Sequence, residues 1–86
     1  MNIDLNLSEN DAINILRLMH VEYVRLLTIN YTTQDDDDRA DSANDGIAIE
    51  MLRKEYEAQL VTKLGQAKLD LAKANFERTY PTPKRP

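Results

Sequence analysis

Two features of this sequence have side chains suited to chemistry: its single histidine, His20, and a run of four aspartates, Asp35–Asp38. Triad chemistry needs a nucleophile and an orienting acid beside the imidazole. His20 falls at the edge of an apolar helical face, and Glu22, the nearest acid in sequence, points well away from it on a helix. We therefore interpret His20 as a partly buried structural residue.

The aspartate run is suggestive of a cation site, but its spacing is unsuitable. A helix–loop–helix calcium site requires alternating oxygen ligands, a mid-loop glycine and a terminal glutamate. Here the four aspartates are contiguous, so alternate side chains diverge, and the glycine–glutamate spacing does not follow. The run predicts a solvated acidic linker. In a second interpretation, the run mimics nucleic-acid phosphate and attracts a basic surface of a partner.

The remaining charged residues do not form an obvious site either. Glu55 and Glu57 diverge by about 160° on a helix, so they cannot act as one acid–base pair within the chain. The chain has no cysteine and one histidine, which argues against a zinc site. We expect no catalytic residue, no metal and no cofactor, and we predict that the chain is not an enzyme.

Four basic residues recur at five-residue steps in the C-terminal half. Each step turns a helix by about 140°, so these side chains spread around the helix and form no phosphate-binding stripe. They are Lys63, Lys68, Lys73 and Arg78.

Charge is distributed unevenly along the 86 residues. The net charge is −4, but residues 1–50 carry −8 and residues 51–86 carry +4. Such a dipolar chain favours contacts between acidic and basic parts, within a hairpin or between copies. The N-terminus has no basic and apolar signal-peptide pattern and no apolar run approaches a membrane span, so the expected location is cytoplasmic.

The sequence pattern predicts an all-α protein. Residues 1–7 form an extended arm, and Ser8 caps a first helix over about 8–31. An acidic, mobile loop over 32–42 leads to a long helix over about 43–79, which Pro81 ends. The proline-rich tail is 80–86, and the whole chain is one small domain, an antiparallel helical hairpin.

The long predicted helix carries apolar residues on two opposite faces. The first stripe has the α-helical period and is suited to packing on the first helix. The second stripe has coiled-coil spacing, and small residues recur every seven positions along it. The first stripe contains Ile49, Leu52, Tyr56, Leu60, Leu64, Ala67, Leu71 and Ala74; the second contains Met51, Ala58, Thr62, Gly65, Leu69, Ala72 and Phe76.

The second stripe is predicted to mediate self-association. A glycine in the middle of a helix costs about 1 kcal/mol of stability relative to alanine, and a solvent-exposed face gives no reason to retain such a glycine. The alternative is that the small residues are simply tolerated on a solvent-exposed face. The apolar arc of the first helix is also too wide for one neighbouring helix to cover. A homodimer that forms a four-helix bundle satisfies both helices.

If self-association occupies the second stripe, a target protein must bind elsewhere. The candidates are Asp35, Asp36, Asp37 and Asp38 in the acidic run and Tyr80, Lys84 and Arg85 in the tail. The predicted function is a homo-oligomeric protein-binding module, an adaptor or an inhibitor. The alternative is a nucleic-acid-linked protein, which contacts DNA or RNA through its basic half or mimics it with the acidic run. In size, acidity and lack of motifs, the chain is similar to small accessory proteins of bacteriophages, many of which block host or defence proteins.

Overall fold

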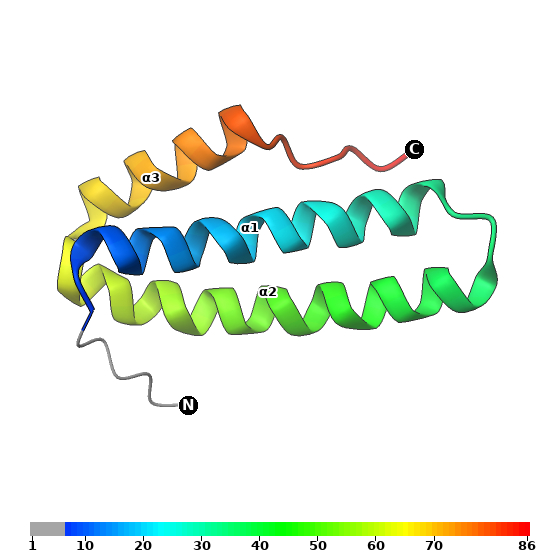
Figure 1. The fold of residues 1–86 in the computed structure, drawn as a ribbon, viewed down its shortest axis with the longest axis horizontal. Coiled ribbons are helices and arrows are strands. Elements are labelled where there is room, and N and C mark those ends of the chain that lie inside the picture. Colours follow the sequence, from blue (N-terminus) through cyan, green and yellow to red (C-terminus); the bar gives the residue numbers. More distant parts are fainter. Residues whose placement is uncertain (1–6) are drawn as a thin grey trace.

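In the computed structural model, which describes residues 7–86, the described chain forms three α-helices and no strand: α1 (Glu9–Thr32), α2 (Asp36–Leu64) and α3 (Gln66–Thr79). Helices α1 and α2 lie antiparallel, and α3 turns back alongside α1 (Figure 1). The all-α class and the hairpin are therefore confirmed. The predicted arm over 1–7 falls, apart from Leu7, outside the described residues.

Helix α1 begins where the sequence predicts. Ser8 has extended backbone angles, and its hydroxyl accepts a hydrogen bond of 3.1 Å from the Asp11 backbone N–H. This bond satisfies one of the donors that a helix leaves unpaired at its start. Glu9 and Asp11 place negative charge in the first turn, near the positive end of the helix dipole.

The connection between the first two helices is much shorter than predicted. Only Thr33–Asp35 separate α1 from α2, so most of the expected mobile loop over 32–42 is helical. The carboxylate of Asp35 caps α2 by accepting from the N–H groups of Asp37 and Asp38, at 2.8 and 3.3 Å. The acidic side chains of the first turn lie at the positive end of the helix dipole, which offsets their mutual repulsion.

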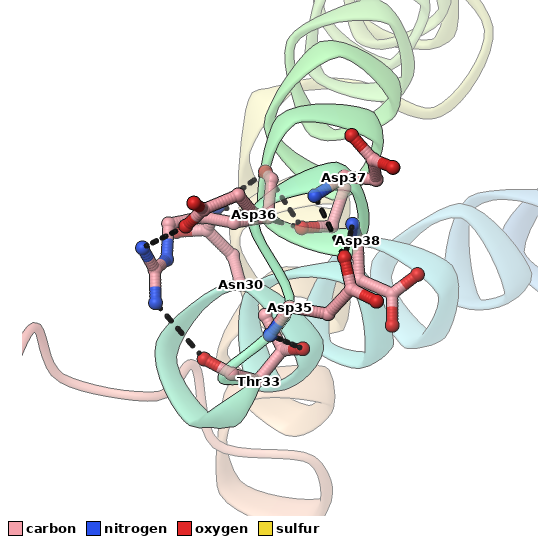
Figure 2. Close-up of polar contacts among 8 residues, drawn as sticks. Asn30, Thr33, Asp35, Asp36, Asp37 and Asp38 are labelled. Atoms are coloured by element: carbon pink, nitrogen blue, oxygen red, sulfur yellow. Dashed lines mark hydrogen bonds and ion pairs between the residues drawn. The ribbon is translucent and has the colours of Figure 1, made fainter.

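Further hydrogen bonds hold this connection in place (Figure 2). The Thr33 hydroxyl accepts from the Asp35 N–H at 3.1 Å, and Arg39 donates to the Thr33 carbonyl at 3.1 Å. From α1, the Asn30 side chain donates to the Arg39 carbonyl at 2.9 Å. Ser42 is buried inside α2, where its hydroxyl donates to the Arg39 carbonyl at 3.1 Å. The short turn is thus built from polar side chains on both helices.

We expect the Asp35→Ala substitution to lower the free energy of unfolding by about 0.5–2 kcal/mol, because it removes the cap of α2. Urea titration followed by circular dichroism measures this change. Asp35→Asn is the matched control, since asparagine retains the capping oxygen while losing the charge. If the asparagine variant were destabilised as much as the alanine variant, the charge and not the cap would be responsible.

The predicted long helix over 43–79 is two helices, because the chain breaks at Gly65. Gly65 has φ 86° and ψ 153°, a combination that is essentially restricted to glycine. Its N–H still donates to the Val61 carbonyl at 2.9 Å, and its own carbonyl accepts from the Leu69 N–H at 3.2 Å. One residue therefore ends α2, reverses the chain direction and starts α3.

The break at Gly65 changes which of the two apolar stripes faces the core. Before it, the first-stripe residues Tyr56, Leu60 and Leu64 are buried; after it, the second-stripe residues Leu69, Ala72 and Phe76 are buried. Conversely, Met51 before the break and Leu71 after it are more than 60 % exposed. The core contains Ala12 and Leu16 from α1, Tyr56, Leu60 and Leu64 from α2, and Leu69, Ala72 and Phe76 from α3.

Helix α1 has two neighbours within its own chain, as its wide apolar arc requires. The buried Tyr56 hydroxyl of α2 donates a hydrogen bond of 3.0 Å to the Ala12 carbonyl of α1. From α3, Phe76 stacks near the His20 ring, with centroids 6.1 Å apart. Among residues 7–86, no helix combines the length and apolar character needed to cross a membrane.

Candidate functional site

A polar cleft lies where α3 and the tail meet the α1/α2 hairpin. It has a volume of about 310 Å³ and is lined by residues from all three helices and from the tail. These are Leu16, His20, Tyr23, Arg53, Glu57, Lys73, Phe76, Glu77 and Thr82. The cleft exists only because α3 folds back at Gly65, which brings positions 53–57 beside positions 73–77.

Glu57 is the central charge of the polar cleft. Lys73 of α3 donates to one of its oxygens at 3.3 Å, while the other oxygen lies 3.9 Å from the Arg53 guanidinium. At 3.9 Å the Arg53–Glu57 pair is an ion pair without a hydrogen bond, so Arg53 Nε and Glu57 Oε1 are both buried without a hydrogen-bond partner in the described chain. Arg53 also lies over the Tyr23 ring, 4.9 Å from its centroid, as in a cation–π contact.

The tail is fastened to the other end of the cleft. His20 Nε2 lies 2.7 Å from the Tyr80 carbonyl oxygen, and because a carbonyl only accepts, Nε2 carries the proton and donates. Glu77 accepts from the Thr82 N–H at 2.6 Å and from the Thr82 hydroxyl at 2.7 Å. The bond from the Thr82 backbone N–H, assisted by the hydroxyl, lowers the pKa of Glu77 below its usual value.

The polar groups of the cleft are engaged in contacts between the elements that line it. Nucleophilic chemistry would need the Thr82 hydroxyl hydrogen-bonded to an imidazole, but it donates to the Glu77 carboxylate. The His20 Nε2 is occupied by a backbone carbonyl. Within residues 7–86, no three acidic or histidine side chains converge in a way that could hold a metal ion. The cleft therefore joins α3 and the tail to the hairpin.

Sequence reasoning did not find this cleft. Glu57 and Lys73 are sixteen positions apart, and on one continuous helix they would lie more than 20 Å from each other. The signal that could have found them is a chain reversal at Gly65, since a hairpin about this residue brings positions 57 and 73 together.

The structure divides the predicted self-association residues into two groups. Met51, Ala58 and Thr62 are exposed on the outer side of α2. Leu69, Ala72 and Phe76 are buried against α1 and α2, so their own chain supplies the cover that they need. Gly65, predicted as part of the self-association stripe, is an exposed turn.

The predicted partner-binding residues remain at the surface. Asp35–Asp38 are exposed at the start of α2, and Lys84 and Arg85 are exposed in the tail. Figure 1 shows the C-terminus on the same side of the molecule as the α1–α2 connection. Arg85 lines a shallow hollow with Ile47 and Glu50 of α2, so the tail returns toward the acidic end. Tyr80 is 37 % exposed.

Comparison with protein-family models, with curated proteins and with solved structures gives no match, so the function of this chain has to be inferred from its own residues.

Proposed function

We propose that this chain is a non-enzymatic, homo-oligomeric protein-binding module, an adaptor or an inhibitor, whose partner contacts the N-terminal half of α2. The observation that supports the proposal is an exposed apolar pair on the same helix as a concentration of negative charge. Ile47 and Met51 are 59 % and 62 % exposed, and their four-residue spacing places them on one side of the helix.

The acidic first turns of α2, which precede this pair along the helix, define the partner's chemistry. Residues 35–46 contain six aspartates and one arginine, a net charge of −5, and all six aspartates are exposed. We expect the partner to present an apolar side chain bordered by lysine or arginine. The apolar contact would supply affinity, while the opposite charges would accelerate association and select against acidic partners.

The Met51→Glu substitution is expected to abolish capture of the partner, because it replaces an exposed apolar contact by a charged side chain that is costly to bury. The test is an affinity pull-down from lysate of the native host, with captured proteins identified by mass spectrometry. Leu71→Glu is the matched control, since Leu71 has a similar exposure of 64 % but lies on α3.

The proposal predicts that one partner protein is captured by the wild type and by Leu71→Glu but not by Met51→Glu. High salt should release this protein from the wild type. Capture of the same proteins by all three variants, or capture only of nucleic acid, would contradict it.

A further inference from the structure

We propose that two copies of this chain associate by exchanging α3: Gly65 straightens, and each α3 packs on the α1/α2 hairpin of the other copy. The inference rests on the homo-oligomeric part of the proposed function and gives it a mechanism. Its basis is the juxtaposition of a one-residue hinge with an element whose contacts are transferable to a second copy.

The hinge depends on one backbone conformation. With φ 86° and ψ 153°, Gly65 occupies a region that other residues avoid. A Cβ built on Gly65 would meet no atom within 4 Å, so a side chain there is opposed only by the backbone angles. Residues on both sides are helical up to Leu64 and from Gln66, so straightening this one residue joins α2 and α3 into a single helix.

The contacts that hold α3 in place are with α1 and α2. Three of its apolar side chains enter the shared core, and two lysines reach carboxylates on the hairpin. Lys68 lies 3.2 Å from Glu9 of α1, and Lys73 lies 3.3 Å from Glu57 of α2. A second copy of α3 would find the same acceptors in the same arrangement, which is the condition for exchange of an identical element.

The direction of α3 also permits exchange. In its own chain α3 starts at the Gly65 end of the hairpin and runs toward the α1–α2 connection (Figure 1). If two hairpins meet at their Gly65 ends about a two-fold axis, a straightened α3 enters the partner at that end and runs the same way along it. The second apolar stripe, continuous across Gly65 in sequence, is then continuous in space.

The experiment uses Gly65→Ala, which disfavours the turn and favours the straight helix. Together, these effects should raise the equilibrium constant for dimerisation by roughly 30- to 1,000-fold per chain. Gly46→Ala is the matched control, because Gly46 lies within α2 and a Cβ there also meets nothing within 4 Å. Gln66→Pro acts in the opposite direction, since proline is tolerated at the first position of α3 but breaks a continuous helix.

Mass is measured by sedimentation, and the connectivity is read by cross-linking a mixture of isotope-labelled and unlabelled protein. A carbodiimide joins a lysine directly to a carboxylate that it contacts, so it should link Lys68 to Glu9 and Lys73 to Glu57. The protein is first unfolded and refolded as a mixture, so that labelled and unlabelled chains can pair. Exchange predicts linked peptides of which one is labelled and the other is not.

The expected result is a dimer for Gly65→Ala with mixed-label links, and a monomer with same-label links for Gln66→Pro. A dimer that shows only same-label links would overturn α3 exchange while leaving self-association through another face intact. A folded Gly65→Ala protein that is monomeric at all concentrations would also overturn it. The pull-down with Met51→Glu is independent of either outcome, because the outer side of α2 is not part of the exchanged contact.

Discussion

Replacing Leu60 by alanine is expected to lower the free energy of unfolding by about 2–5 kcal/mol, the range for truncating a fully buried leucine. Leu60 is 0 % exposed and lies in the core shared by all three helices. A chain of this length is expected to have a total stability of roughly 4–13 kcal/mol. The substitution therefore removes a large share of it and leaves part of the population unfolded.

Urea titration with circular dichroism measures this loss as a shift in the transition midpoint. Leu18→Ala is the control, because it deletes the same atoms from a side chain that is 57 % exposed and should change stability by no more than about 0.5 kcal/mol. Equal losses in the two variants would contradict the assignment of Leu60 to the core.

The Phe76→Ala substitution is expected to release α3 and the tail from the hairpin. Truncating a buried phenylalanine costs about 3–5 kcal/mol, and Phe76 is the largest of the side chains that α3 contributes to the core. The contacts that remain are Leu69, Ala72, the exposed Lys68–Glu9 pair, the Lys73–Glu57 pair and the hydrogen bond from His20 to the Tyr80 carbonyl. We expect the docked state of α3 to be lost before the α1/α2 hairpin unfolds.

Hydrogen exchange at individual amides distinguishes this local release from general destabilisation. We expect amides of α3 to lose protection while those of α1 and α2 keep most of theirs. Leu71→Ala, at an exposed position of the same helix, should leave all three helices protected. A uniform loss of protection in Phe76→Ala would show that the three helices unfold as one unit.

Local sequence signals predicted α1 and the hairpin well, because they depend on neighbours in sequence. The Ser8 cap and the apolar spacing of residues 12–27 act within a few turns of the helix. The acidic run was harder to interpret. Repulsion among Asp35–Asp38 favours a mobile loop, whereas capping and the helix dipole favour a helix start, and charge pattern alone does not determine which effect is larger.

The break at Gly65 could not be predicted from periodicity. Both apolar stripes continue across this residue with regular spacing, so the pattern is the same for a straight helix and for a reversal. A continuous helix would leave Leu69 and Phe76 without cover in their own chain, which is why it predicts a second copy. The polar cleft was missed for the same reason, since Glu57 and Lys73 come together only after the chain turns.

The three-residue connection between α1 and α2 also has a consequence for the order of folding. Closing so short a loop costs little entropy, and folding rates rise as contacts become more local. The hairpin is therefore expected to form first, which leaves α3 as a late-docking arm that can reach its own hairpin or a neighbour's. The ratio of these outcomes depends on chain concentration during folding, so dilute refolding should give closed single chains and concentrated refolding should trap pairs.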